Sequence, residues 1–167
     1  MKTRLALHNC KDLAPDIVYL PGDNFYWSPE NISVYYVPSL LDTPEGNWAL
    51  IHETAHALLR HSSYSSDYEL LSLEMEAWEK SRQISVEIQN KIDEDHIQNC
   101  MDTYRNWLYS RSTCPNCSQS GLQTSNLLYT CVNCLTEWKV SQSRFCRSYR
   151  ALIQKKTPLS IKKTVFN

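Results

Sequence analysis

The chain has 167 residues, of which 42% are hydrophobic, and its formal net charge is −1. This length supports one compact domain with a small appendage and a sizeable core. No run of 18 apolar residues occurs and the apolar stretch near Met1 is too short for a signal peptide, so we expect neither a membrane span nor secretion.

Residues 16–37 have the pattern of short β-strands. Residues 17–20 form one apolar run, which ends at Pro21-Gly22. Residues 25–27 and 32–37 are rich in β-branched and aromatic side chains and flank a turn, so they predict a hairpin. We therefore expect a small antiparallel sheet, and we expect residues 32–37 to offer an edge to which an extended peptide can add as an extra strand.

The next segment contains His-Glu-x-x-His within an apolar helical pattern. Thr43 is the predicted N-cap and Pro44 the first helical residue of a helix that runs to about Arg60. His52 and His56 stand one turn apart on one face, so both imidazoles can bind one metal ion. Glu53 flanks that site and can take a proton from a zinc-bound water, whose pKa the metal lowers to roughly 7.

A second helical pattern, which opens with the capping box Ser66-x-x-Glu69, runs to about Gln89. Of its glutamates, Glu74 alone lies near the middle of the apolar stripe at 100° per residue, while Glu76 lies on the polar face. A buried carboxylate needs compensation, which a metal ion provides. We therefore predict Glu74 as the third ligand, with Glu76 as the second choice.

His61 is one position short of the third histidine in the metzincin pattern, which would also require glycine at position 59, where this chain has leucine. We therefore expect His61 to support a ligand or to sit at the helix C-terminus, where positive charge is favoured, rather than to bind the metal itself.

The run from His52 to His61, followed by Glu74-Met75-Glu76-Ala77, resembles the ImmA/IrrE family of zinc metallopeptidases over about residues 15–90. The resemblance implies His52 and His56 as ligands, Glu53 as catalytic base and Glu74 as third ligand in the gluzincin manner. It also implies a regulatory role, the cleavage of repressor-type transcription factors. The family motif has Asn or Asp where this chain has Trp78.

Residues 92–110 predict a third helix that covers the core, with Cys100 as a small buried hydrophobe. After it come two Cys-x-x-Cys pairs, formed by Cys114, Cys117, Cys131 and Cys134, which predict a structural zinc ribbon. The chain has seven cysteines, an odd number, and paired knuckles favour metal binding in a reducing compartment over disulfides. We therefore predict a cytoplasmic protein.

The C-terminal segment is basic: residues 138–167 carry 8 Lys and Arg and no acid, whereas residues 1–137 carry all 18 acids. Aromatic side chains at Trp138, Phe145 and Tyr149 are interleaved with Arg144, Arg147 and the basic residues that follow. This pattern predicts either contact with nucleic acid or docking of the tail on the acidic body.

We predict an α+β fold in which a small antiparallel sheet packs on the helix of His52 and on a ligand-bearing helix. The expected parts are a metallopeptidase domain (1–111), a zinc ribbon (112–140) and a basic tail (141–167). The predicted cofactors are one catalytic and one structural zinc ion.

The favoured function is an intracellular zinc endopeptidase that hydrolyses a regulatory protein, such as a DNA-binding repressor, by zinc-activated water with Glu53 as general base. The alternative is a non-proteolytic regulator that binds nucleic acid or protein through the ribbon and the tail. A SprT-like protease ranks last, because it needs a histidine as third ligand and only His61 and His96 follow His56.

Overall fold

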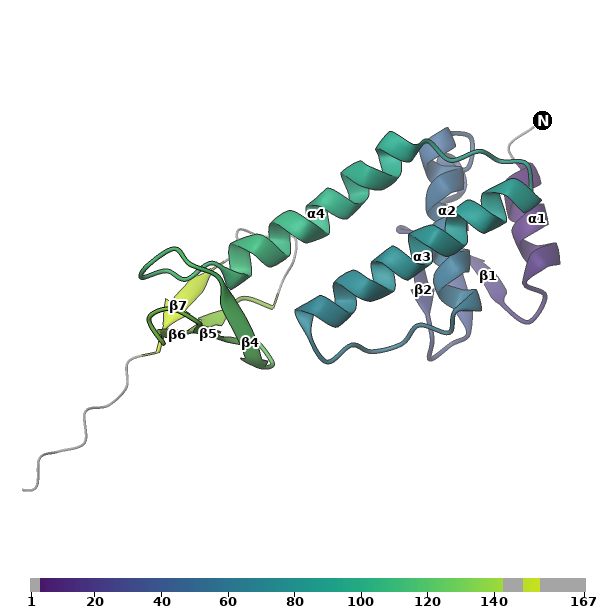
Figure 1. The fold of residues 1–167 in the computed structure, drawn as a ribbon. Helices are drawn as coiled ribbons and strands as arrows, with labels where there is room; N and C mark the ends of the chain where they lie inside the picture. The colour runs from purple at the N-terminus through teal and green to yellow at the C-terminus, as the bar shows by residue number, and fades with distance from the viewer. Residues whose placement is uncertain (1–3, 143–148, 154–167) are drawn as a thin grey trace, which may run out of the picture. The chain divides into compact units, whose positions relative to one another are not determined.

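A computed structural model describes residues 4–142 and 149–153 of the chain (Figure 1). The chain divides into two compact units, residues 1–108 and 109–167. The described helices are α1 (Arg4–Leu13), α2 (Pro44–Leu58), α3 (Asp67–Glu87) and α4 (Glu94–Ser112), with a 3-10 turn at Pro38–Leu40. The strands are β1 (Val18–Pro21), β2 (Tyr26–Ser28), β3 (Ser33–Tyr36), β4 (Gly121–Ser125), β5 (Leu128–Cys131), β6 (Glu137–Val140) and β7 (Arg150–Leu152). The predicted α+β class is confirmed.

The sheet of the first unit has the order β1-β3-β2 and is mixed. The predicted hairpin is present, because β2 and β3 pair antiparallel with Trp27 opposite Val34. The expectation of a purely antiparallel sheet is wrong, however, since β1 pairs parallel with β3. The expected substrate edge at residues 32–37 is also wrong, because β3 is the central strand and is paired on both sides. The free edges belong to β1 and β2.

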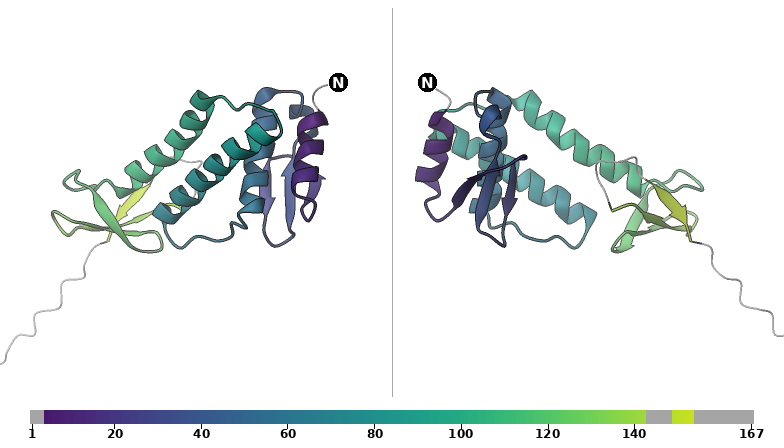
Figure 2. Two further views of the ribbon diagram at one scale, coloured as in Figure 1. Left: turned by 45° about the vertical axis from the view of Figure 1, so that its right-hand side comes forward. Right: turned by 180° about the vertical axis from the view of Figure 1, so that it is seen from behind.

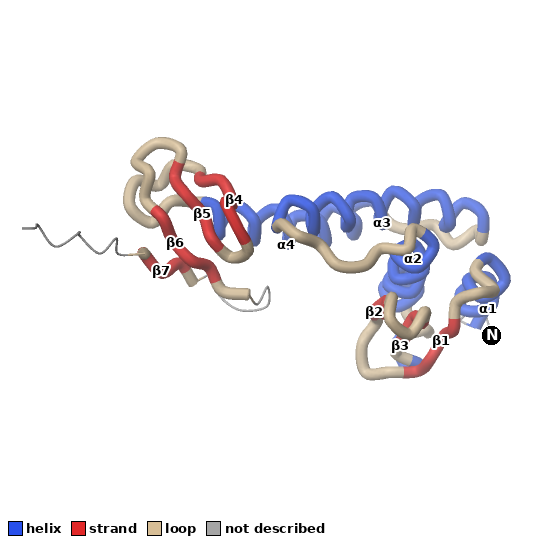
Figure 3. Tube along the Cα trace, turned by 90° about the horizontal axis from the view of Figure 1, so that it is seen from below, coloured by secondary structure: helices blue, strands red, loops and turns tan. Residues whose placement is uncertain are grey.

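Helix α2 lies between the sheet and α3, as Figures 2 and 3 show. Its N-cap is Thr43, as predicted, whose hydroxyl accepts a hydrogen bond from the Gly46 N–H at 3.0 Å. Tyr19 on β1 ties the layers together, because its hydroxyl lies 3.1 Å from the Thr54 hydroxyl on α2 and donates to the Cys10 carbonyl at the end of α1. The helix that carries His52 is thus buried on more than one side.

Helix α3 begins at the predicted cap, where the Ser66 hydroxyl accepts from the Glu69 N–H at 3.1 Å. The Glu69 carboxylate accepts a hydrogen bond from the Ser65 N–H at 2.6 Å, and this bond fixes the loop that precedes the helix. Along the helix, Ala77, Trp78 and Ile84 are buried in the core of the first unit. These residues lie on the same apolar face of the helix as Glu74, as predicted from the helical periodicity of the sequence.

The second unit contains the antiparallel sheet β4-β5-β6-β7 and its own small core around Trp138, which is fully buried. The Trp138 indole donates to the Arg111 carbonyl at 2.9 Å, and the Arg150 guanidinium donates to the Thr113 carbonyl at 2.7 Å. Strand β7 lies within the segment assigned to the tail, so part of that segment belongs to the ribbon sheet. Most of the predicted nucleic-acid contacts lie outside the described residues: Arg144, Phe145, Arg147 and the basic residues from Lys155 onward.

None of the helices that the structure describes is both long enough and apolar enough to span a membrane.

The close approach of α2 to the preceding 3-10 turn depends on Gly46. A Cβ added there would lie 2.0 Å from the Leu40 carbonyl oxygen, which is backbone and cannot rotate away. Glycine to alanine in a helix normally stabilises by about 1 kcal/mol. We predict the opposite sign for Gly46→Ala, a loss of about 1–3 kcal/mol, from urea unfolding followed by far-UV circular dichroism. The control is Gln83→Ala on the exposed face of α3, for which we expect little change; a Gly46→Ala variant as stable as the wild type would contradict the packing.

Candidate metal centre

Helix α2 presents His52 and His56 toward one point. Their rings are nearly perpendicular, with an interplanar angle of 88° and centroids 4.6 Å apart, and their Nε2 atoms lie 3.1 Å from each other. His52 is buried and His56 half-buried. Spacing of four residues on a helix places the two rings one above the other, as the sequence predicted.

Glu74 reaches the same point from α3. One carboxylate oxygen lies 3.2 Å from the His52 Nε2, and the other lies 3.7 Å from the His56 Nε2. Burial alone would raise the pKa of this carboxyl group, but the contacts with His52 and His56 outweigh burial and lower the pKa to about 2. Glu74 is therefore a buried anion whose partners are the two imidazoles.

The spacing of these atoms fits a metal ion. Zinc bonds of about 2.0–2.1 Å in tetrahedral geometry place neighbouring ligand atoms roughly 3.3–3.4 Å apart. The two histidine Nε2 atoms lie 3.1 Å apart, one Glu74 oxygen lies 3.2 Å from the His52 Nε2, and the other lies 3.7 Å from the His56 Nε2, all near that spacing. His52, His56 and Glu74 therefore form a candidate metal-binding group, in which each residue offers one ligand atom.

Glu53 flanks this group on α2 and is half-buried. Its Oε2 accepts a hydrogen bond from the Trp27 backbone N–H on β2, at 2.8 Å. This contact fixes the carboxylate beside the sheet and was not predicted, because the sequence gives no local signal for a contact between residues 26 positions apart. The edge strand β2 thus borders the glutamate that follows the first histidine.

Glu76, the second choice for the third ligand, does not join the group. Its side chain is 62% exposed and its Oε2 lies 3.4 Å from the Nε2 of His61. His61 is itself buried, and its Nδ1 lies 2.8 Å from the Nδ1 of His56. Burial and the neighbouring His56 lower the pKa of His61, against the opposing effect of Glu76. The structure therefore places His61 behind a histidine of the group, as expected, and not within the group.

Trp78 occupies the position of the family's Asn or Asp and stacks on His52, with centroids 4.1 Å apart and an interplanar angle of 25°. Among the described residues, neither the His52 Nδ1 nor the Trp78 Nε1 has a hydrogen-bond partner, although both atoms are buried. His96, the other histidine of the SprT-like alternative, lies against Trp48 and Trp78. His52 is therefore positioned by aromatic packing.

The Cys100 sulfur lies 3.6 Å from the His96 Nε2. Burial, and to a lesser extent the negative charge of Glu74, raises the pKa of the Cys100 thiol. A thiol with a raised pKa is a poor nucleophile at neutral pH, which agrees with the prediction of a packing role.

The four cysteines of the ribbon form the second candidate metal-binding group. Cys114 and Cys134 have sulfur atoms 3.7 Å apart, and Cys117 and Cys131 have sulfur atoms 3.5 Å apart. Zinc–sulfur bonds of about 2.3 Å in tetrahedral geometry imply roughly 3.8 Å between sulfurs. Hydrogen bonds from Thr136 lower the pKa of Cys134.

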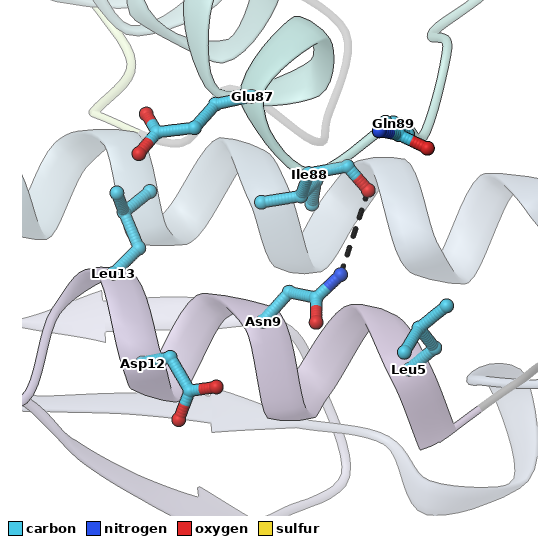
Figure 4. A pocket seen from close by; sticks show the side chains of 7 residues that line it. All are labelled: Leu5, Asn9, Asp12, Leu13, Glu87, Ile88 and Gln89. Carbon is cyan, nitrogen blue, oxygen red and sulfur yellow. Dashed lines mark hydrogen bonds between the residues drawn. The ribbon is translucent and has the colours of Figure 1, made fainter.

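Elsewhere in the first unit, a hollow of about 580 Å³ lies between α1 and the end of α3 (Figure 4). The Asn9 amide spans it to the Ile88 carbonyl at 3.4 Å, and the carboxylates of Asp12 and Glu87 line it. It contains neither histidine nor cysteine and none of the residues of the two metal-binding groups.

Comparison of the chain with family models, with curated proteins and with solved structures found no match. The resemblance to the ImmA/IrrE family therefore depends on the motif residues alone.

We predict that the full chain binds two metal ions, one at each group. Native mass spectrometry with saturating zinc should find one ion in Glu74→Ala, because the variant leaves two ligands, and two in Glu76→Ala, because Glu76 lies outside the group. Two ions in Glu74→Ala, or one in Glu76→Ala, would contradict the assignment of the third ligand.

Proposed function

We propose that the first unit is a zinc-dependent endopeptidase in which His52, His56 and Glu74 hold the metal. The observation that carries the proposal is the convergence of two imidazole nitrogens and one buried carboxylate. Two histidines with one glutamate are a ligand set of catalytic zinc sites, which leave a position open for water. Zinc bound there would supply a Lewis acid that lowers the pKa of water to about 7.

Glu53 is the group to which we assign proton transfer. Peptide hydrolysis forms a C–O bond between water and the carbonyl carbon, breaks the C–N bond, and requires a proton on the leaving nitrogen. The Glu53 carboxylate takes that proton from the attacking water and delivers it to the amine. The 2.8 Å hydrogen bond from the Trp27 N–H supports this role, because it restrains the carboxylate beside the metal-binding group.

The strand β2 supports a peptide as the substrate. It lies at an edge of the sheet, and the Trp27 N–H on this edge reaches Glu53. An extended peptide that runs along an exposed edge can use its backbone groups for binding. A substrate on this edge would pass the proposed base. The motif resemblance extends the proposal to a regulatory protein of the repressor type as substrate.

An endopeptidase also needs a donor to the developing oxyanion, and Tyr64 and Tyr68 are the tyrosines of the segment that joins α2 to α3 and of the first turn of α3. Both are exposed, at 49% and 72%, and no described contact joins either of them to the metal-binding group. We therefore assign neither of them a role in the proposed reaction.

Substitution of Glu53 by Gln tests the proposal. The amide oxygen of glutamine can still accept from the Trp27 N–H but cannot take a proton, so zinc binding should persist and cleavage should fall roughly 10²–10⁴-fold. The measurement is mass spectrometry of a proteome-derived peptide library incubated with the zinc-loaded full chain. Glu45→Gln, in the exposed first turn of α2, is the matched control. No cleavage by the wild type would refute the endopeptidase, and undiminished cleavage by Glu53→Gln would refute the base.

A second candidate is a non-proteolytic regulator that binds nucleic acid through the ribbon and the basic tail. Two observations favour it: within the described part of the chain the His52 Nδ1 has no partner of the kind that usually orients a ligand, and the sequence has no acid after Glu137. Lys139 and Arg150 are exposed on β6 and β7.

The second candidate predicts salt-dependent binding of the full chain to a fluorescein-labelled DNA duplex. Replacement of Lys155, Lys156, Lys162 and Lys163 by alanine should make the slope of log K against log salt less negative, by roughly 3–4 if each lysine contacts a phosphate. Lys80→Ala with Lys91→Ala is the control pair and should leave the slope unchanged. Absence of binding at low salt would eliminate this candidate.

A further inference from the structure

The two histidines of the metal-binding group differ in what lies behind them. The His56 Nδ1, which points away from the group, meets the Nδ1 of His61 at 2.8 Å. The His61 Nε2 in turn lies 3.4 Å from the Glu76 carboxylate. The His52 Nδ1 has no such partner among the described residues and lies in a ring that stacks on Trp78.

A left-handed turn at the end of α2 brings His61 to this position. Arg60 has a φ of 56°, and the backbone N–H groups of residues 60 and 61 donate to the carbonyls of Ala57 and His56, at 3.1 Å each. These two bonds define a Schellman motif, which reverses the chain over the last helical turn. The Trp27 indole donates to the His61 carbonyl at 2.7 Å and secures the reversed segment. A non-glycine residue with positive φ costs free energy, so the surrounding contacts must maintain this turn.

We propose that His61 and Glu76 form a positioning relay that fixes the tautomer and the orientation of His56; this inference deepens the proposed metal site and rests on it. A metal ligand needs a lone pair on the His56 Nε2, which puts the proton on Nδ1. That proton can be donated only if the His61 Nδ1 accepts, which puts the proton of His61 on Nε2. The His61 Nε2–H then faces the Glu76 carboxylate. The two contacts therefore fix one tautomer for each ring: His56 carries its proton on Nδ1 and His61 carries its proton on Nε2.

The relay gives the two ligands unequal support. Hydrogen bonds orient His56, whereas packing on Trp78 orients His52. Partners behind a ligating histidine commonly contribute 10–100-fold to metal affinity. The alternative is that His61 only fills space or interacts with the end of the helix dipole. A space-filling role would be served equally well by a similar ring without nitrogen, and a dipole role would need a protonated ring, so neither requires the His61 Nδ1 to accept a hydrogen bond from His56.

Zinc affinity of the full chain separates these cases. The measurement is competition with a fluorescent chelator after the ribbon has been saturated. We expect His61→Phe to weaken binding at the His52 group roughly 10–100-fold and His61→Gln, whose amide oxygen can accept from His56, to recover part of that loss. Glu76→Leu should weaken binding by a smaller factor, because Glu76 is exposed, and Glu76→Gln should recover it. His8→Phe and Glu87→Leu are the matched controls on exposed positions.

The tautomers provide a readout that a packing role would not move. Long-range ¹H–¹⁵N correlation spectra of the zinc-loaded full chain should show His56 protonated at Nδ1 and His61 protonated at Nε2. His61 protonated at Nδ1, or affinities of His61→Phe and Glu76→Leu within twofold of the wild type, would overturn the relay. If His61→Phe fails to fold, the exposed Glu76 variants and the wild-type spectrum still decide. A wild type that binds zinc at the ribbon alone refutes the metal site itself, and with it the relay that rests on that site.

Discussion

A carboxylate buried against two imidazoles is the interaction on which the first unit depends. Glu74 keeps its charge with a pKa near 2 only because His52 and His56 offset the cost of burial. Local features of the sequence position the two helices that carry this contact. Thr43 caps the start of α2, Ser66 caps the start of α3, and Gly46 lets the first turn of α2 lie against the Leu40 backbone. An uncompensated charge at this position would oppose the packing of α3 on α2, so this contact between the two helices and the proposed chemistry depend on the same three side chains.

The site could be predicted largely because its residues follow helical periodicity. His52 and His56 share a face by spacing alone. The position of Glu74 in an apolar stripe distinguishes it from the other glutamates of α3, and the structure buries it on that face. The sequence could not predict the parallel pairing of β1 with β3. Strand β2 lies between these two strands in the sequence, so their pairing depends on how the strands pack on α2 and not on a local turn signal. The contact of His61 with Glu76 was missed for a similar reason. It depends on the left-handed turn at Arg60, which no glycine marks.

The two metal-binding groups relate differently to their surroundings. In the ribbon, the four cysteines are themselves much of the core, together with Tyr129, Trp138 and Val140, so a metal ion bound by them would couple its binding to the folding of this unit. In the first unit, a core of some sixteen buried residues exists apart from the ligands, and the helices position the ligands in advance. Preorganised ligands suit the proposed site, which would have to hold a metal ion while a substrate enters.

The most direct measurement of the central claim is anomalous diffraction at the zinc edge from zinc-saturated crystals of the full chain. We predict a peak about 2.0–2.1 Å from the Nε2 atoms of His52 and His56 and from a carboxylate oxygen of Glu74. A peak at the four cysteines alone, with the three side chains arranged as described and no density between them, would contradict the account.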